Sequence, residues 1–184
     1  MKQRRDALAA AAKLALDIRN IAGKHSDAVC TMGSLKTFPG IVTAVVGRCE
    51  ATLDQRDLDA KVLAQMYREA QEASKQFASE ENCTVEWSRI WSIEPIRFHS
   101  HLIDLCEQAV REISGNSHRL PSGPLHDAAE VSRAGIPTVM MFVQSLRGIS
   151  HNKIEDTREE HLEMSVTALD RLATETVDWI LKAN

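Results

Sequence analysis

The sequence predicts a mixed fold in which a small α+β sheet domain precedes an α/β domain. In the first half, amphipathic helical stretches separate segments rich in β-branched residues. In the second half, short strand-like and helical segments alternate, which is typical of a parallel α/β layer. A proline interrupts the pattern at Glu94-Pro95, so the predicted domains are residues 1–95 and 96–184.

Two helices are predicted in the first domain. From Arg4 to about Lys24 apolar residues recur every three or four positions, and Gly23 stands where a helix stop is expected. A second helix is predicted from about Leu58 to Ser79, with Asp57 as its N-cap because a carboxylate there can accept the free amides of the first turn.

Three strands complete the prediction for this domain. Residues 28–35 and 41–54 are predicted as strands joined by a turn at 36–40, and residues 84–93 alternate in the manner of a third strand. The order helix, strand, strand, helix, strand corresponds to a ferredoxin-like split β-α-β motif that lacks its first strand.

The second domain is predicted to alternate helices with strands. The helices cover residues 101–113, a short stretch around 128–131 and the long amphipathic segment 160–181. A short strand is expected at 118–120. The continuous apolar run at 136–143 predicts a strand buried on both faces.

Composition excludes several classes of protein. The 184 residues carry a net charge of −4, which gives no basic surface for nucleic acid or for a membrane. No apolar run reaches the 18 or so residues that cross a bilayer, and the first residues lack the apolar segment of a secretory signal. We therefore expect a cytoplasmic protein. The four cysteines are widely spaced and predict structural thiols rather than a zinc ribbon.

Two loops concentrate reactive side chains, residues 122–128 and 145–157. Both are expected at the carboxyl ends of strands, where ligands bind in open α/β sheets. His151 could bind a metal ion, with Glu155 orienting its imidazole from behind. The alternative is ordinary capping and surface hydrogen bonding, because no local set of three or four ligands is present. Ser122 lacks the Gly-x-Ser-x-Gly elbow of serine hydrolases.

Four motifs stand in order along the chain: Met1-x-x-Arg-x-Asp-Ala-Leu8, Leu53-Asp-x-Arg56, Ser122-Gly-Pro-Leu-His-Asp-Ala128 and Gly148-Ile-Ser-His-x-x-x-Glu-x-Thr157. In these motifs the sequence resembles the amidase branch of the zinc-dependent M20 hydrolases. This branch includes N-carbamoyl-L-amino acid hydrolases, allantoate amidohydrolases and ureido-acid hydrolases such as β-ureidopropionase. The motifs follow the family's order and span essentially the whole chain.

The resemblance implies a dimeric zinc hydrolase whose inserted lid domain forms the dimer contact. Residues 1–95 would be most of this lid, and residues 96–184 the C-terminal part of the catalytic domain. His151 corresponds to the family's C-terminal zinc ligand, and Arg56 to the lid arginine that binds the substrate carboxylate through its planar fork. Gly148 matches a position where backbone lies close to substrate, and His126 and Asp127 match a loop near the site.

The sequence departs from the family pattern at three positions. Thr43 replaces the lid asparagine that helps bind substrate, which places substrate choice or activity in question. Leu125 stands where the branch usually has glycine, and Gln144 where it often has proline.

By the same resemblance, the family's other zinc ligands, its general-base glutamate and its lid histidine would precede Met1. Two hypotheses follow. The chain is the C-terminal fragment of an enzyme that uses zinc, or another transition metal such as manganese, to hydrolyse a small N-carbamoyl or ureido acid. Alternatively, it is a truncated, non-catalytic chain that acts as an association module or as one half of a split enzyme. In either case the isolated chain, with one ligand of the three that catalytic zinc requires, is expected to hold no metal tightly.

Overall fold

The computed structural model describes residues 3–183, so the match at Met1 lies outside the described residues. The chain forms two compact units, one up to Pro95 and the other from Ile96 onward. Together they give a mixed helix and strand structure with one two-stranded sheet. Among the described residues, no helix is long and apolar enough to cross a bilayer.

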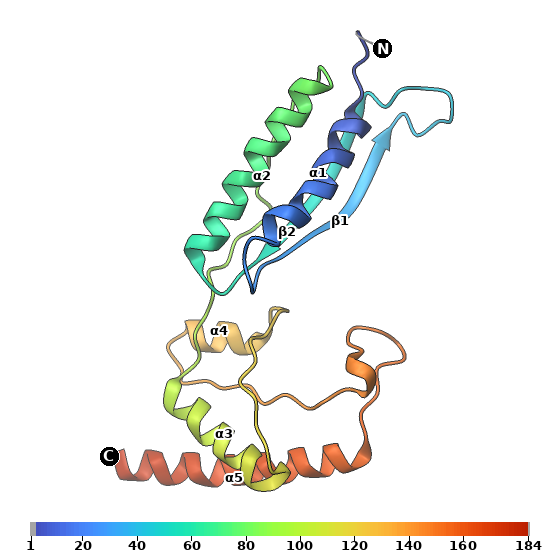
Figure 1. Cartoon of the computed structure of the whole chain (residues 1–184). Coiled ribbons are helices and arrows are strands. Elements are labelled where there is room, and N and C mark those ends of the chain that lie inside the picture. Colours follow the sequence, from blue (N-terminus) through green and yellow to red (C-terminus); the bar gives the residue numbers. More distant parts are fainter. Residues whose placement is uncertain (1–2, 184) are drawn as a thin grey trace. The chain divides into compact units, whose positions relative to one another are not determined.

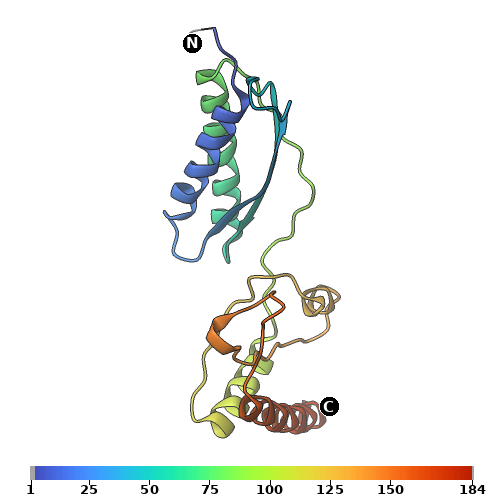
Figure 2. The ribbon, with the colours of Figure 1, turned by 90° about the vertical axis from the view of Figure 1, so that its right-hand side faces the viewer.

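The first unit places two helices on one face of an antiparallel hairpin (Figures 1 and 2). Its elements are α1 (Ala7–Ala22), β1 (Val29–Phe38), β2 (Arg48–Arg56) and α2 (Ala60–Glu80). The register pairs Val29 with Arg56 and Phe38 with Arg48, with an irregularity between Met32 and Ser34. Helix α1 lies within its predicted range, and α2 ends one residue beyond its predicted end at Ser79.

The helix ends follow from local hydrogen bonding. Asp6 caps α1 by accepting the Ala9 N–H at 3.2 Å, and Gly23 follows its last residue as predicted. The predicted cap of α2 was wrong by two residues. Asp59 is the N-cap and accepts the Lys61 N–H at 2.7 Å, whereas Asp57 accepts the N–H of Asp59 at 2.7 Å.

The core of the first unit lies between the helices and the hairpin. Ile21, Met66 and Ala70 form its buried centre, and the partly buried Leu53 and Trp87 pack against them. The Trp87 indole N–H donates to the hydroxyl of buried Ser74 at 2.9 Å, so the one polar group of the indole is satisfied.

Two strand predictions in this unit were wrong. Residues 39–47 form a loop, so β2 begins at Arg48 and not at residue 41. Residues 84–93 are extended but join no ladder. Alternating apolar residues predict an extended chain with one buried face, but a strand also needs a hydrogen-bonded neighbour, which local pattern does not specify.

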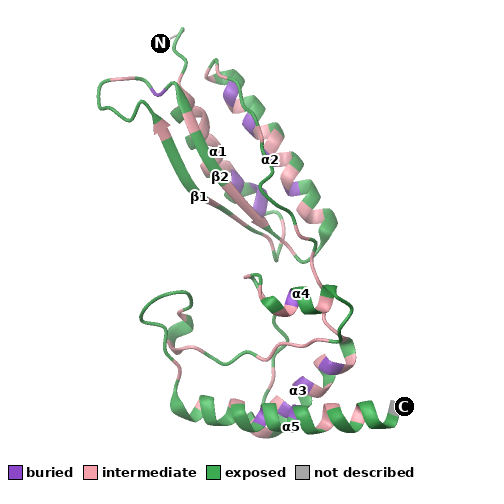
Figure 3. Cartoon of the chain, turned by 180° about the vertical axis from the view of Figure 1, so that it is seen from behind, coloured by how far each residue is buried: buried purple, intermediate pink, exposed green. Residues whose placement is uncertain are grey.

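The second unit is built on two packed helices. Its elements are α3 (Ser100–Ser114), α4 (Asp127–Arg133), the single 3₁₀ turn η1 (Leu146–Gly148) and α5 (Glu159–Ala183). Helix α3 packs against α5 around Cys106, Ala109 and Leu172. Cys106 is the cysteine that is buried; the other three are half-buried. Most of α5 is exposed (Figure 3).

No parallel sheet is present within residues 96–183, and the strand predictions at 118–120 and 136–143 were wrong. The apolar run is not buried on both faces. Val139 and Met141 pack against the α3–α5 core, whereas Ile136 is 56% exposed and Phe142 48% exposed. No strand among the described residues pairs with this run, which is why it is extended but unpaired.

Candidate functional site

The loop after the 136–143 segment is closed by backbone hydrogen bonds. The Leu146 N–H donates to the Asp156 carbonyl at 2.7 Å, which joins the two ends of the loop. The Ile149 N–H donates to the Leu146 carbonyl at 3.2 Å and completes the 3₁₀ turn. The polar residues between these ends therefore lie on a closed loop and not on an extended tail.

Left-handed backbone is concentrated in this loop. Gly148 has φ +66°, and the non-glycine residues Arg147 and His151 have φ of +59° and +56°. Residues other than glycine rarely adopt a positive φ, so the surrounding structure must hold them in this conformation. Residues held in this way are found most often at ligand and active sites. The geometry thus marks residues 147–151 as the candidate site of the second unit.

His151 is exposed, and its backbone rather than its ring is fixed by Glu155. The Glu155 Oε2 accepts the His151 N–H at 2.8 Å, and the Glu155 N–H donates to the Asn152 carbonyl at 2.9 Å. The expectation that Glu155 would orient the imidazole was therefore wrong: its carboxylate accepts the backbone N–H of His151 and stabilises the left-handed turn.

His126 is the N-cap residue of α4, but its side chain makes no capping hydrogen bond. Its half-buried ring lies 6.5 Å from that of Phe142, at 61° between the ring planes. Asp127 is exposed in the first turn of α4, and the Ser122 hydroxyl donates to the Pro124 carbonyl at 2.8 Å. Ser122 thus closes its own turn, and His126 packs against the extended segment that leads to residues 147–151.

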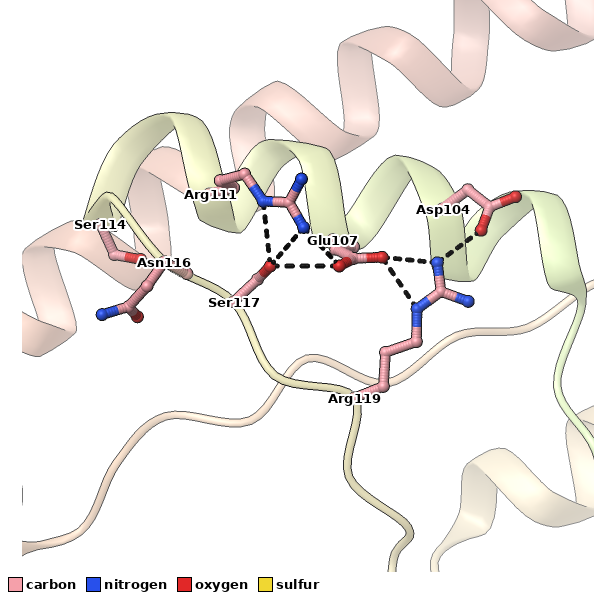
Figure 4. Close-up of polar contacts among 7 residues, drawn as sticks. All are labelled: Asp104, Glu107, Arg111, Ser114, Asn116, Ser117 and Arg119. Carbon is pink, nitrogen blue, oxygen red and sulfur yellow. Dashed lines mark hydrogen bonds and ion pairs between the residues drawn. The ribbon is translucent and has the colours of Figure 1, made fainter.

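An ion-pair cluster on α3 holds the chain that leads into the 122–128 loop (Figure 4). Arg119 donates to Glu107 at 2.8 Å and to Asp104 at 2.7 Å, and Arg111 donates to Glu107 at 2.6 Å and to the Ser117 hydroxyl. The Arg119 hydrogen bond holds the pKa of the Glu107 carboxyl below its usual range. The cluster fixes residues 117–119 on α3 and so limits where the loop can begin.

Arg56 and Thr43 belong to the first unit, and the structure does not bring them together. Arg56 is the last residue of β2, where its Nε donates to Asp54 at 2.6 Å. Thr43 is exposed in the loop that precedes the first residue of β2. Nine residues rising about 3.3 Å each separate the two ends of this strand by roughly 26 Å. Within one copy of the chain, one small carboxylate cannot contact both side chains.

The described residues do not make a metal site by themselves. Between residues 3 and 183, no three His, Cys, Asp or Glu side chains lie close enough together to hold one ion. His151 is a suitable ligand without companions in this part of the chain. We therefore derive no step through a metal ion from these residues alone.

Sequence reasoning missed the strained geometry of the 147–151 turn and the backbone role of Glu155. The spacing of His151 and Glu155 was visible, but a positive φ at a histidine or an arginine has no signature in sequence. A glycine at position 148 was the one local signal of an unusual turn.

Comparisons with known proteins agree along nearly the whole chain. Residues 7–175 match the family described as peptidase family M20/M25/M40. An N-carbamoyl-L-amino acid amidohydrolase of Geobacillus stearothermophilus is 30% identical over 169 residues, covering 92% of this chain and 41% of that protein. An allantoate amidohydrolase of Escherichia coli is 28% identical over 141 residues, covering 77% of this chain and 34% of that protein.

A solved structure of an amidase is also similar to this chain over nearly its whole length. The hydantoinase/carbamoylase family amidase of Burkholderia multivorans superposes with a TM-score of 0.86 at 30% identity, over 94% of this chain and 42% of that one. The chain thus spans about two fifths of the length of the relatives it matches.

Proposed function

The chain belongs to peptidase family M20/M25/M40, and we propose that it supplies the lid and the C-terminal part of the catalytic domain of an amidohydrolase. Its substrate would be a small N-carbamoyl or ureido acid. Water adds to the carbamoyl carbon, the C–N bond breaks, and ammonia, carbon dioxide and an amino acid are released. The observation that carries this proposal is the match over 92% of the chain to an N-carbamoyl-L-amino acid amidohydrolase.

His151 is proposed as one ligand of the metal ion, zinc or a similar transition metal such as manganese. Enzymes of this family are generally metal-dependent. The strained, exposed position of His151 supports this role because it presents an imidazole at the tip of a closed loop. A bound metal ion would polarise the scissile carbonyl and lower the pKa of its water. The remaining ligands and the general base have to come from residues beyond those described.

The substrate-binding residues are proposed as Arg56, Thr43, Gly148 and His126. Arg56 would bind the substrate carboxylate, since a guanidinium offers two parallel donors to two oxygens. Gly148 would allow close approach of backbone to substrate, because no heavy atom lies within 4 Å of the position of a Cβ there. We further propose that the first unit mediates formation of a homodimer. If Arg56 and Thr43 bind one carboxylate, they must then come from different copies, because β2 separates them within one chain.

The metal proposal is tested with a fusion of this chain to the part of the Geobacillus stearothermophilus relative that it does not match. The fusion is expected to bind one metal ion per chain and to hydrolyse N-carbamoyl amino acids or allantoate. His151→Ala should abolish tight metal binding, measured by metal analysis after dialysis, whereas the exposed His118→Ala should retain it. A folded, active fusion that keeps its metal without His151 contradicts the assignment.

The same fusion tests Arg56, with Arg48 as a matched control. Both arginines lie on the same face of β2 and pair with a neighbouring carboxylate, Asp54 for Arg56 and Glu50 for Arg48. Arg56→Ala is expected to lower kcat/KM by an amount that corresponds to a loss of about 2–4 kcal/mol in transition-state stabilisation, since a charged hydrogen-bonded pair loses one partner. Arg56→Lys should recover part of this loss, and Arg48→Ala should leave the kinetics unchanged. An unchanged kcat/KM in Arg56→Ala overturns its role.

The exposed face of α5 favours a second candidate, a non-catalytic association module or one half of a split enzyme. Five apolar side chains form a stripe along α5 that the described chain leaves uncovered. Their exposed fractions are 48% for Leu162, 67% for Val166, 56% for Leu169, 54% for Val177 and 48% for Ile180. Uncovered stripes of this size are typical of surfaces that pack against further polypeptide. The proposed occupant is the part of an M20 enzyme that this chain does not match.

Binding of that unmatched part of the Geobacillus relative, added as a separate polypeptide, tests this candidate by analytical ultracentrifugation. The double substitution Val166→Glu and Leu169→Glu places two charges in the stripe and should abolish binding. Thr167→Glu adds a charge outside the stripe and should preserve binding. Binding without turnover favours the association module, and binding with turnover favours the split enzyme. Absence of binding to the unsubstituted chain contradicts both.

A further inference from the structure

The chain that enters α1 lies between two other segments of the first unit. The Ala7 N–H donates to the Val46 carbonyl at 3.0 Å, just before β2, and the Asp6 N–H donates to the Glu81 carbonyl at 3.4 Å, just after α2. Asp6 is extended, with φ −127° and ψ 91°. Consecutive N–H groups of an extended chain point to opposite sides, as in a strand that has a neighbour on each edge. At this end of the unit, a third segment therefore separates the chain entering β2 from the chain leaving α2.

Strand β2 and the extended residues 84–93 run in the same direction from that end. Both begin close to the first residues of α1, through Val46 and Glu81. Further along, Leu53 of β2 and Trp87 of the extended segment pack against the same buried cluster. The two segments are joined through α2, and a helical crossover of this kind connects parallel strands of one sheet.

Residues 84–93 are held against α2 by side chains and not by a ladder. The Trp87 indole N–H donates to the Ser74 hydroxyl at 2.9 Å, and its ring meets that of Tyr67 edge-on with centroids 5.7 Å apart. The Arg89 guanidinium lies 4.5 Å above the same Tyr67 ring. Figure 1 shows this segment on the side of β2 opposite to β1. Among residues 3–183, no strand pairs with it or with the second edge of β2.

The two helices cover more strands than the hairpin supplies. Helix α1 contacts both β1 and β2, whereas α2 contacts β2 and not β1, so α2 extends past the second edge of β2. Two helices about 10 Å across cover about 20 Å, which is the width of four strands about 4.8 Å apart. The hairpin and residues 84–93 account for three. A segment directly beside β2 would share its ladder, so the open strand position lies between β2 and residues 84–93.

From these observations we propose that the first unit binds one extended strand in this open position, antiparallel to both of its neighbours. The strand would continue the line of the chain that enters α1 and run toward it, opposite to β2 and to residues 84–93. It would receive backbone hydrogen bonds on both edges, as in recognition by strand addition. Its alternate side chains would face the helices beside Leu53 and Trp87, so they should be apolar.

The occupant is a segment of the part of an M20 enzyme that this chain does not match, and to that extent the inference rests on the proposed function. The Geobacillus relative has ample length to supply it, because this chain covers 41% of that protein. A second copy of this chain is the competing occupant, and the experiment separates the two.

The test compares residue-resolved amide hydrogen exchange in the isolated chain and in its fusion to the unmatched part of the Geobacillus relative. Neighbouring residues of a strand point their N–H groups to opposite edges. The added strand should therefore protect every second amide of residues 84–93 and the amides of β2 that face away from β1. We expect these amides to exchange more slowly in the fusion by about tenfold or more. Unchanged exchange in residues 84–93, protection confined to β1, or the same protection in the isolated chain at high concentration overturns the proposal.

Proline at two neighbouring positions gives a matched control. Proline removes the backbone N–H and is compatible with an extended chain. Ser88→Pro and Arg89→Pro remove N–H groups that point to opposite edges, so only one of them should abolish the new protection of β2 in the fusion. Arg89→Ala controls for the loss of the guanidinium above Tyr67 and should keep this protection. Abolition by both prolines or by neither contradicts a strand at this edge.

Turnover of N-carbamoyl amino acids by the same fusion separates this inference from the proposed function. An inactive fusion with protected residues 84–93 supports the strand and counts against the amidohydrolase. An active fusion in which residues 84–93 exchange as in the isolated chain overturns the strand and leaves the amidohydrolase standing.

Discussion

Ser74 satisfies two hydrogen bonds in the core of the first unit, where it is 3% exposed. Its hydroxyl accepts the Trp87 indole N–H at 2.9 Å and donates to the Gln71 carbonyl at 2.8 Å. Ser74→Ala leaves a half-buried indole N–H without its partner. We expect a loss of about 1–3 kcal/mol in the free energy of unfolding, measured by urea titration.

The matched control is Thr174→Ala, because the exposed Thr174 hydroxyl bonds only within its own helix, to the Asp170 carbonyl at 3.0 Å. Its change should stay within about 0.5 kcal/mol. Equal effects at Ser74 and Thr174 would show that the Trp87 bond does not stabilise the fold.

His151 adopts a backbone conformation that a β-branched residue tolerates poorly. At φ +56°, His151→Val is expected to lower the free energy of unfolding by about 1 kcal/mol, whereas His151→Gly should be neutral or stabilising. Urea titration of both variants measures this. If Val and Gly are equally stable, the turn is not held in the left-handed region, and the strain argument for this site fails.

At the scale of elements, the helices could be predicted and most strands could not. Helices α1, α3 and α5 follow the local spacing of apolar residues, and their observed ends lie within a few residues of the predicted ones. The segments at 84–93 and 136–143 have the composition of strands, but strands also need neighbours distant in sequence. The alternation at 84–93 and the continuous apolar run at 136–143 predicted an extended backbone correctly and hydrogen-bonded pairing incorrectly.

The attachment of residues 117–119 to α3 predicts a pH dependence. Because Arg119 lowers the pKa of Glu107 in the folded protein, the stabilisation is present above the ordinary glutamate pKa and is lost as pH falls below about 4.3. The difference in urea midpoint between the unsubstituted chain and Glu107→Gln should therefore shrink between about pH 6 and pH 3. The exposed Glu163→Gln is the control, and its difference should not change in this way.

At the scale of the whole molecule, each compact unit has its own core. Met66 is fully buried in the first unit, and Leu172 is 7% exposed in the second. Met66→Ala should cost about 2–5 kcal/mol and speed amide exchange in α1 and α2, while α3 and α5 keep their rates. Leu172→Ala should do the reverse. Faster exchange throughout the chain in either variant would mean that the two units unfold together.

The sequence by itself determined the helices, the family and the identity of the candidate site residues. These depend on local periodicity and on motifs such as Gly148-Ile-Ser-His151, which are properties of neighbouring residues. Tertiary structure alone decided that the whole of β2 lies between Thr43 and the Arg56 at its end, and that Glu155 holds the His151 backbone. Each of these depends on where the chain turns and on which distant segments meet, and a one-dimensional pattern does not specify either.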